Sequence, residues 1–412
     1  MGLKPAHQQM KLGVVPEAWE TPLLDAVAKR GSGHTPNKKH PEYWNGNIHW
    51  ISLKDSDALD NLYIDSTAAT ITQAGIANSS AVVHPAGTVV LSRDAGVGKS
   101  AIMKGEMAVS QHFMAWQCGH RLDNHFLYYW LQSQKPEFER VAFGNTIKTI
   151  GLPYFRSLKI PLPPLPQQRA ISSALSDVDA LLGALDRLFT KKRALKRAAM
   201  QQLLSGDTRL PGFSGQWTET PLGNIGLFSK GIGITKDDVV TSGVPCVRYG
   251  ELYTHHHDYI RTFNSFITRE MAARSQRIEK GDLLFAGSGE TAEEIGKCVA
   301  FLGDEEAYAG GDIVILRPAN QDSRFLGYLM NHSSIVGQKA RMGQGHAVVH
   351  ISATNLGRLV LRLPPQPEQA AIAEVLFDMD AELATLSQRR DKTLALKQGM
   401  MQQLLTGRTR LV

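Results

Sequence analysis

The stretch Gly96-Val97-Gly98-Lys99-Ser100 has residue types that could hold a nucleotide phosphate, because it ends like a phosphate-binding loop. Such a loop needs a further glycine five residues before the glycine of its Gly-Lys pair, and it opens a helix. The required position is Arg93, and Gly105 interrupts the segment that would form the helix. We therefore interpret the stretch as a β-turn between two strands and expect no nucleotide site.

A second glycine pattern, Phe285-Ala286-Gly287-Ser288-Gly289, has the form of the loop with which methyltransferases bind S-adenosylmethionine. A methyltransferase that acts on an amine also needs an Asp/Asn-Pro-Pro-Tyr/Phe loop for its target. The Pro-Pro pairs of this chain, Pro163-Pro164 and Pro364-Pro365, both follow a leucine. We expect no bound cofactor.

Metal and acid-base chemistry are also poorly supported. His255-His256-His257 are adjacent, so they cannot converge on one ion from a strand, and no cysteine or carboxylate spacing completes a site. A solvated loop is the simpler interpretation. The acidic pairs Glu293-Glu294 and Glu305-Glu306 fit surface charge on loops, and no nuclease spacing accompanies them. We expect neither catalytic residues nor metal ligands.

Composition bounds the class of protein. The chain has 412 residues, 42% of them hydrophobic, which allows two or three domains with real cores. A net charge of +6 permits a nucleic-acid partner without demanding one. Three sparse cysteines, Cys118, Cys246 and Cys298, favour a reducing compartment without disulfides or structural zinc. Without a run of about 18 apolar residues or a signal peptide, we expect a cytoplasmic protein with no membrane contact.

A segment of about fifty residues occurs twice. Leu162 to Leu210 aligns with Leu363 to Leu411 at a constant offset of 201, without gaps and with about half the positions identical. Solenoid repeats have about 20–50 residues, so a repeat at this distance indicates a duplicated half-molecule. Two similar surfaces related by an approximate two-fold axis suit a partner with its own two-fold symmetry, of which duplex DNA is the commonest.

Each repeat predicts a long helix that follows a proline cluster and ends at Gly206 or Gly407. The spacing of apolar residues is that of a coiled-coil seam, and each helix would have about 38 residues and a length of about 57 Å. Because so narrow a stripe cannot stabilise a lone helix, we expect the two helices to pair, antiparallel. The seam positions are Ile171, Leu175, Val178, Leu182 and Leu185, repeated at Ile372, Leu376, Met379, Leu383 and Leu386.

Charged residues on these helices have open roles. A lysine and arginine run lies in the first helix and is either a solvated face or a contact to phosphate or partner. Asp177 and Asp179, repeated at Asp378 and Asp380, are expected to be structural or partner-facing rather than catalytic. The basic run consists of Arg187, Lys191, Lys192, Arg193, Lys196 and Arg197.

The segments before the helices, residues 13–160 and 212–361, contain short β-like runs separated by Gly, Asn and Asp. Faint echoes link them: Trp19 matches Trp217, and Phe126-Leu127 matches Phe325-Leu326. We therefore predict an α+β chain: two mostly β heads, each followed by a long helix, with the helices paired as an antiparallel coiled coil of internal pseudo-two-fold symmetry. The expected boundaries are 1–161 and 212–362 for the heads, and 162–211 and 363–412 for the helical segments.

Several sequence motifs that occur in a fixed order indicate a protein family. The chain resembles, over essentially its whole length, the specificity (S) subunit of a type I restriction–modification system. The motifs are LPPLPQQRAI and LPPQPEQAAI before the helices, the endings MQQLLSGDTRL and MQQLLTGRTRL, and the head openings GSGHTPNKKHPEYWNGNIHW and GQWTETPLGNIG. Within the heads, LSRDAGVGKSAI and GSGETAEEIGKCVAF match the family's strand, glycine loop, Gly-Lys, strand element.

The resemblance implies that each head is a target recognition domain that reads one half of a bipartite, asymmetric duplex DNA target, and that the coiled coil sets the spacing. It implies a non-catalytic subunit that docks two modification subunits, which methylate adenine N6; restriction subunits are further expected partners. S-adenosylmethionine, ATP and Mg would then belong to those partners. One departure concerns the ends of the repeats. The first repeat continues into Pro211-Gly212-Phe213, whereas the second stops at Leu411-Val412. We therefore hypothesise that the segment Val15 to Trp19 takes the matching place beside the second repeat and so completes the approximate two-fold symmetry.

Candidate DNA contacts are polar and basic loop residues, because base edges give specificity and phosphates give affinity and register. We expect Trp44 and Trp50 to belong to the core. In the first head the candidates are Lys38, Lys39, His40, Tyr43, Lys54, Arg93, Asn145 and Lys148. In the second they are Lys230, Lys236, Arg248, Tyr249, His255, His257, Arg274, Arg277 and Arg341.

Two other classes compete with this interpretation. A stand-alone DNA methyltransferase or nuclease predicts a complete cofactor loop and catalytic motif, which the sequence lacks. A coiled-coil scaffold without sequence preference predicts heads of low complexity or of equal sequence, whereas these segments are distinct. The target bases, the spacer length and the head that reads each half-site do not follow from the sequence.

Overall fold

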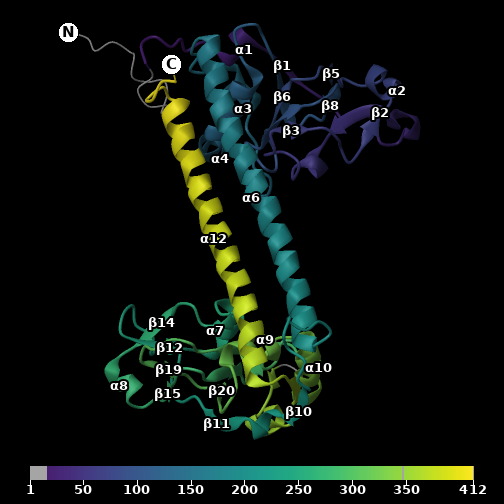
Figure 1. Ribbon diagram of the computed structural model, residues 1–412. Helices are drawn as coiled ribbons and strands as arrows, with labels where there is room; N and C mark the ends of the chain where they lie inside the picture. The colour runs from purple at the N-terminus through teal and green to yellow at the C-terminus, as the bar shows by residue number, and fades with distance from the viewer. Residues whose placement is uncertain (1–15, 346–347, 412) are drawn as a thin grey trace, which may run out of the picture. The chain divides into compact units, whose positions relative to one another are not determined.

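The computed structural model describes residues 16–345 and 348–411, and the chain divides into two compact units. One unit comprises residues 1–186 with 388–412, and the other residues 187–387. Each unit holds one head together with a part of each long helix, α6 (Leu165–Ser205) and α12 (Gln366–Leu404) (Figure 1). Among the described residues, no helix has the length and apolar character needed to cross a membrane.

The first head is built on two sheets, of strand order β1-β9-β6-β7-β3 and β4-β2-β8-β5. Strand β6 lies in the middle of the larger sheet and is buried on both faces, which explains its unbroken apolar run. The larger sheet contains β1 (Ala28–Ser32), β3 (Tyr63–Ile64), β6 (Val89–Ser92), β7 (Ser100–Met103) and β9 (Phe113–Cys118). The smaller contains β2 (Trp44–Ile51), β4 (Thr70–Ile71), β5 (Val83–His84) and β8 (Met107–Val109).

The second head has two sheets of the same sizes, of strand order β11-β20-β16-β18-β13 and β14-β12-β19-β15. Short pairs β10 with β22 and β17 with β21 are added. The larger sheet contains β11 (Gly226–Lys230), β13 (Asp258–Tyr259), β16 (Leu283–Ala286), β18 (Cys298–Ala300) and β20 (Ile313–Pro318). The smaller contains β12 (Val244–Val247), β14 (Ser265–Ile267), β15 (Gln276–Ile278) and β19 (Ala307–Ala309); the short pairs are β10 (Thr218–Pro221), β22 (Val360–Leu363), β17 (Ser288–Gly289) and β21 (Val349–His350).

The two heads share one topology. Strand β6 corresponds to β16 and β9 to β20, and the parallel pairs fall at equivalent places: β2 with β8 and β3 with β7 in one head, β12 with β19 and β13 with β18 in the other. The predicted fold class, two mostly β heads each followed by a long helix, is confirmed. Duplication is therefore visible in the heads as well as in the helices.

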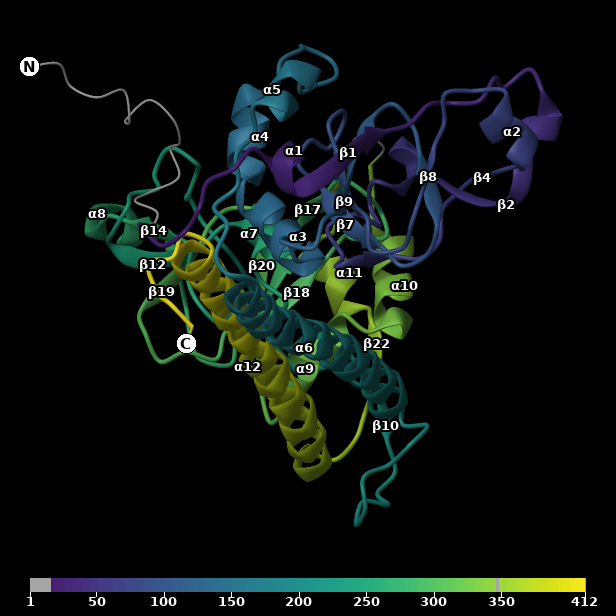
Figure 2. The same ribbon diagram turned by 90° about the horizontal axis from the view of Figure 1, so that it is seen from above.

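Short helices complete each head. Of these, α3 in the first head and α9 in the second lie against the larger sheet (Figure 2). The first head has α1 (Leu24–Val27), α2 (Gln73–Ala77), α3 (Asn124–Ser133), α4 (Lys135–Val141) and α5 (Leu152–Arg156). The second has α7 (Tyr249–Thr254), α8 (Arg269–Ala272), α9 (Ser323–Met330), α10 (Ser333–Met342) and α11 (Ala353–Gly357).

A buried glutamine joins each long helix to its own head. Asp123 caps the N-terminus of α3, and its backbone N–H donates to Gln168 Oε1 at 2.8 Å. The Gln168 amide donates in turn to the carbonyls of Arg121 and Pro163. The second unit repeats the arrangement, with Gln369 accepting from the backbone N–H of Asp322, the cap of α9. The glutamine of the LPPxPxQ motif thus has a structural role: it satisfies buried backbone groups.

The helices run antiparallel in each unit. In the first, Lys397 pairs with Asp179 and Arg390 with Asp186, so the α12 number falls as the α6 number rises. In the second, Lys196 pairs with Asp380 and Lys192 with Glu382. The expected antiparallel pairing is confirmed, and the helices have 41 and 39 residues. Within the basic run, Lys192 and Lys196 contact the other helix, while Arg187, Lys191, Arg193 and Arg197 are exposed.

The first seam residues of each long helix pack against a head as well as against the other helix. Ile171 and Leu175 are fully buried in the core of the first head, in one cluster with Phe126 and with Leu404 and Leu405 from the end of α12. The second unit has the same composition, because Ile372 and Leu376 join the head core together with Leu203 and Leu204 from the end of α6. Each seam therefore begins inside a head.

Glycines end both helices at left-handed backbone conformations, φ +79° at Gly206 and +72° at Gly407, as the sequence predicts. Each lies against a tryptophan: a Cβ added at Gly206 would be 3.3 Å from the Trp217 ring, and one at Gly407 would be 3.1 Å from the Trp19 ring. Trp19 thus occupies beside α12 the place that Trp217 occupies beside α6. This agrees with the hypothesis that the segment before Trp19 closes the two-fold, although Val15 lies outside the described residues.

We predict that Gln168→Ala lowers the free energy of unfolding by about 1–3 kcal/mol, because one buried and two partly buried hydrogen bonds to backbone groups are lost. Urea denaturation of the full chain measures the change. Gln398→Ala, at an exposed position of α12, is the control and should change it by less than about 0.5 kcal/mol. Equal effects of the two substitutions would contradict the role assigned to Gln168.

Candidate nucleic-acid interface

The loop between β6 and β7 organises the first head. It carries the glycine stretch 96–98, and its Lys99 ammonium donates to the carbonyl of Ser56 at 3.0 Å and lies 3.5 Å from Asp57 Oδ1. Strand β7 begins at Ser100 and pairs antiparallel with β6, so no helix follows the loop. The predicted turn between two strands is confirmed, and the lysine serves to tie the loop to a neighbouring turn.

A hairpin at residues 143–149 is bound to this loop. Phe143 and Thr149 exchange two backbone hydrogen bonds, and the N–H of Ala95 donates to the carbonyl of Lys148 at 3.2 Å. The N–H of Ile150 donates to the carbonyl of Arg93 at 2.9 Å. The structure thus brings together three candidates that are far apart in sequence. Asn145 and Lys148 are exposed, and Arg93 is partly buried.

Hydrogen bonds extend the same surface toward the loop of residues 34–44, which we call the basic loop. The His112 ring contacts Asp94 Oδ2 at 2.7 Å, and the carbonyl of His112 accepts from the N–H of Arg93. The neighbouring Gln111 accepts from the Thr35 hydroxyl at 2.7 Å. The chain of contacts therefore runs from the 143–149 hairpin to the start of the basic loop.

Beyond Thr35 the basic loop is exposed. Lys38, Lys39 and His40 lie on its surface, and the His40 ring stacks on Tyr43 with 4.8 Å between centroids. His40 also contacts Glu42 at 2.9 Å; a backbone hydrogen bond and this contact lower the pKa of Glu42. Lys54 is exposed on the short 3-10 turn Leu53–Asp55, next to the Ser56 carbonyl that Lys99 binds. As expected, Trp50 is buried; Trp44 is only partly buried.

The second head repeats this arrangement with different residues. In its glycine loop, residues 287–297, the Lys297 ammonium donates to the carbonyl of Tyr253 at 3.2 Å, as Lys99 does to Ser56. The Tyr253 hydroxyl donates to the carbonyl of Ser288 at 3.0 Å. A Cβ added at Gly289 would lie 2.8 Å from that hydroxyl, so close packing explains this glycine without a cofactor. Strand β17 pairs with β21, which places the Ser288 hydroxyl 2.9 Å from the His350 ring.

Four candidates of the second head, Arg248, Tyr249, His257 and Arg341, lie in segments next to its glycine loop. Tyr249 begins α7, and its exposed side chain follows Arg248, whose guanidinium contacts Glu251 at 3.3 Å. His257 lies 3.3 Å from the Lys297 ammonium, and burial, followed by this charge, lowers its pKa. Burial also lowers the pKa of Lys297. Arg341, exposed near the end of α10, precedes the hairpin that contains β21.

The triplet of histidines corrects one expectation. His255 and His257 are exposed, but His256 is buried, with 3% of its surface accessible, so the segment is not a fully solvated loop. The backbone N–H groups of His255 and His256 both donate to the carbonyl of Glu251, so the segment continues directly from the end of α7. No cluster of three or more His, Cys, Asp or Glu with metal-binding geometry occurs among the described residues.

The remaining candidates lie toward the smaller sheet. Lys230 ends β11, and exposed Lys236 follows it. Arg277 lies in the edge strand β15, and Arg274 precedes that strand. A Cβ added at Gly233 would be 3.9 Å from the carbonyl of Arg274, so the loop of Lys236 and this turn are neighbours.

Sequence reasoning missed polar residues that connect these loops. Gln111 and His112 join the basic loop to the glycine loop in the first head, and Ser288 with His350 joins two loops in the second. They belong to no motif, and their partners are distant in sequence. The sequence could have indicated these residues only through their positions, directly before or after strongly apolar strand segments.

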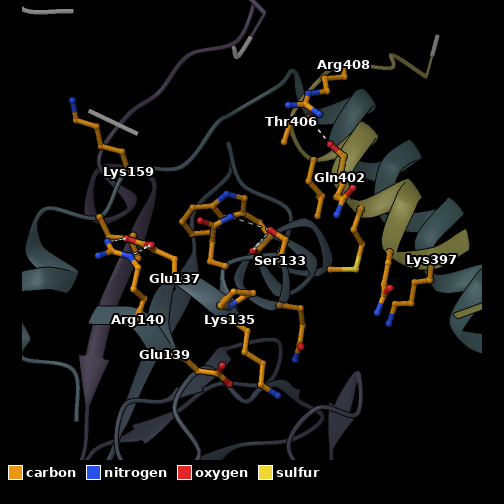
Figure 3. A pocket seen from close by; sticks show the side chains of 18 of the residues that line it. Ser133, Lys135, Glu137, Glu139, Arg140, Lys159, Lys397, Gln402, Thr406 and Arg408 are labelled. Atoms are coloured by element: carbon orange, nitrogen blue, oxygen red, sulfur yellow. Dashed lines mark hydrogen bonds and ion pairs between the residues drawn. The ribbon is translucent and has the colours of Figure 1, made fainter. Parts of the chain in front are cut away.

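A cleft of about 1280 Å³ lies in the first unit, between α4 and the C-terminal part of α12 (Figure 3). Glu137 and Arg140 of α4 form an ion pair on one side, and Lys397 and Gln402 of α12 lie on the other. Lys397 is bound to Asp179, outside the cleft lining. The Glu137–Arg140 pair therefore lies within α4, whereas the Lys397–Asp179 pair joins the two long helices.

Two heads of one topology, with different polar loops gathered around equivalent glycine loops and joined to repeated helices, define a duplicated recognition protein. Comparison with known proteins agrees. The model of the type I restriction modification DNA specificity domain matches residues 16–192 and again 217–395. The chain belongs to this family of DNA specificity subunits of type I restriction–modification systems and has two recognition domains. Such subunits are the non-catalytic specificity subunits of their complexes.

Individual relatives are distant. The MjaVIII specificity subunit of Methanocaldococcus jannaschii is 22% identical, over 96% of this chain and 94% of that subunit. A match of 26% identity to the MjaIX specificity subunit of the same organism spans 42% of this chain and only 41% of that subunit. The crystal structure of an S subunit from M. genitalium superposes with a TM-score of 0.60 at 17% identity, covering 95% of this chain and 96% of that one.

We predict that acid destabilises the second unit through His256. Burial lowers the pKa of this ring below 6.5, so the unfolded chain binds a proton that the folded chain does not as the pH falls through 6.5. Stability must therefore fall with pH in this range. In His256→Gln the slope of unfolding free energy against pH between 7.5 and 5.5 should decrease, by up to about 1.4 kcal/mol per pH unit. Exposed His255→Gln is the control; an unchanged slope in His256→Gln would refute the assignment.

Proposed function

We propose that each head reads one half of a bipartite, asymmetric duplex DNA target and that the helix pair sets the distance between the half-sites. One observation carries the proposal: the heads have the same scaffold but different side chains on the loops that surround equivalent glycine loops. A protein that read a symmetric target would need equal loops, whereas these predict two different half-sites.

The chemistry of the loops suits DNA. In the first head, exposed Lys38, Lys39 and Lys148 supply positive charge for phosphates, and Asn145 offers an amide that can pair with adenine. In the second, exposed Arg341 and Arg274 supply guanidinium groups that can bind guanine through two hydrogen bonds. The remaining candidates in the basic loop, α7 and β15 are proposed to complete the two surfaces.

The subunit is proposed to act by directing partners. It would dock two modification subunits, which bind S-adenosylmethionine and methylate adenine N6 in the target, and it would recruit restriction subunits, which use ATP and Mg. The described residues of this chain provide no arrangement for these reactions, so its contribution is the choice and orientation of the DNA. A chain of similar fold, with a TM-score of 0.58 at 17% identity, was solved in connection with complex assembly and conformational transition of the type I system, which supports such partners.

The proposal is tested by a methylation map. Host DNA should acquire adenine methylation at one bipartite motif when this chain is expressed together with its neighbouring modification subunit, and not when the modification subunit is expressed alone. Single-molecule sequencing reads the motif directly. An unchanged map, combined with failure of the purified chain to select any sequence from random duplexes, would overturn the proposal.

Substitutions separate the two kinds of contact. Lys148→Ala should weaken binding to every duplex alike and lower the slope of log affinity against log salt by about 1, because one phosphate contact is lost. Arg341→Ala should cost about 1–3 kcal/mol and relax a single base position, because a guanidinium that binds guanine is lost. The control is Lys104→Ala, an exposed lysine at the opposite end of β7 from the glycine loop. Fluorescence anisotropy at several salt concentrations measures both; identical behaviour of the control and Lys148→Ala would place the reading surface elsewhere.

A further inference from the structure

One polar cluster occurs in both units. In the first, the hydroxyl of Tyr129 on α3 donates to Asp179 Oδ2 of α6 at 2.9 Å. The ammonium of Lys397 on α12 lies 2.6 Å from Asp179 Oδ1 and 5.7 Å from the centre of the Tyr129 ring. A helix of the head, the helix that follows the head and the helix of the other repeat thus meet at a single carboxylate.

The second unit contains the same cluster. The Tyr328 hydroxyl on α9 donates to Asp380 Oδ2 of α12 at 2.6 Å. The Lys196 ammonium of α6 donates to both carboxylate oxygens, at 2.8 and 2.9 Å, and lies 5.1 Å from the ring centre of Tyr328. We name the two clusters, Tyr129-Asp179-Lys397 and Tyr328-Asp380-Lys196, the carboxylate triads.

The triads stand out from the other ion pairs between the helices. Asp179 and Asp380, like Lys196 and Lys397, occupy equivalent positions of the repeat at the offset of 201. The pair of Lys192 with Glu382 has no equivalent, because Thr393 and Leu181 stand at those positions. Arg390 with Asp186 is likewise unrepeated. About half of the repeat has diverged, yet the triads have kept both composition and geometry.

Burial makes the triads resistant to rearrangement. Both tyrosine side chains are almost inaccessible, and burial raises the pKa values of Tyr129 and Tyr328, so their hydroxyls remain proton donors. The exposed fractions of the Asp380 and Lys196 side chains are 9% and 12%. Charge-assisted hydrogen bonds in such surroundings are directional and screened little by salt. A head that rotated about its helix would have to break one.

We propose that the carboxylate triads fix the angle at which each head is held on the helix pair, and that they thereby determine which spacer length the protein accepts in DNA. This inference rests on the proposed function. One added base pair turns a half-site by about a tenth of a helical turn. A head that can follow this rotation accepts both spacers, whereas a head locked by its triad accepts one. The triad residues are positioning residues, because they act through the heads.

The two triads are not equally reinforced. Asp380 also lies 3.2 Å from the guanidinium of Arg261, and the Lys196 ammonium lies 3.6 Å from Asp258. Both additional residues belong to the second head. The triad of the first unit has the Ser176 hydroxyl, 3.1 Å from that of Tyr129, as its added neighbour. We therefore expect a single substitution to loosen the first head more than the second.

The test uses the full chain assembled with its modification subunits and duplexes that carry the mapped half-sites at the cognate spacer and at one base pair more or fewer. Initial rates of adenine methylation give a spacer selectivity, the cognate rate divided by the altered rate. Lys397→Met and Tyr129→Phe should lower this ratio by about tenfold, the factor expected from the loss of one hydrogen bond to a charged group. The equivalent changes Lys196→Met and Tyr328→Phe should lower it less.

Matched controls are Lys191→Met and Lys392→Met, at equivalent, exposed positions of the same two helices. They should keep the wild-type ratio. Triad variants that fold but retain wild-type selectivity overturn the inference. This holds even when their melting temperature falls, because a purely structural role lowers the methylation rates on all duplexes together and leaves their ratio unchanged. If Lys397→Met fails to fold, Tyr129→Phe, which removes one hydroxyl, decides the question. Failure of the proposed function is recognised separately, because the wild-type complex would then prefer no motif at any spacer.

Discussion

The fold depends on one constraint: each long helix has a single narrow apolar stripe, which has to serve both a head and the other helix. Ile171 and Leu175 complete the core of the head before them, and Leu404 and Leu405 from the other repeat complete the same core. Ile372, Leu376, Leu203 and Leu204 do this in the second unit. Neither core is closed by its own half of the sequence, so the two halves depend on each other to fold.

The shared scaffold separates support from recognition. Central strands, capped helices and the inward-turned lysines at 99 and 297 are equivalent in both heads and satisfy their polar groups internally. The loop after β1 and its equivalent after β11, residues 231–243, differ in most residues, as do the turn Leu53–Asp55 and its equivalent α7. Residues that hold the frame and residues that face solvent for a ligand are therefore largely different sets.

Much of this was predictable because it follows from local periodicity and from a repeat that aligns without gaps. The long helices, their ends at Gly206 and Gly407, their antiparallel pairing and the two β-rich heads all follow from such patterns. The glycine loops could be recognised as turns because required residues were missing at known distances. The candidate DNA residues were selected by type and loop position, and the structure brings some of them together around the glycine loops; their contacts with DNA stay a prediction.

Other features were not accessible from the sequence because they join distant residues without periodic spacing. The buried state of His256 depends on how the chain continues from α7 into β13. The contacts of Gln111, His112 and His350 depend on strand order, which no local pattern encodes. Asp179 and Lys397 were visible as repeated charges, but their common partner Tyr129 lies in a head whose sequence has diverged.

The inward turn of Lys99 and Lys297 has a consequence for how such a protein can change. Both ammonium groups donate to backbone carbonyls of their own head, and Lys99 also lies next to the carboxylate of Asp57, so the most constant part of each loop cluster offers little free charge to a ligand. Sequence preference must then depend on the segments around the glycine loops, which contribute little to the core. Substitutions in these segments can change the sequence preference of a head one residue at a time, with little effect on folding. The preference of one head can therefore change while that of the other stays the same.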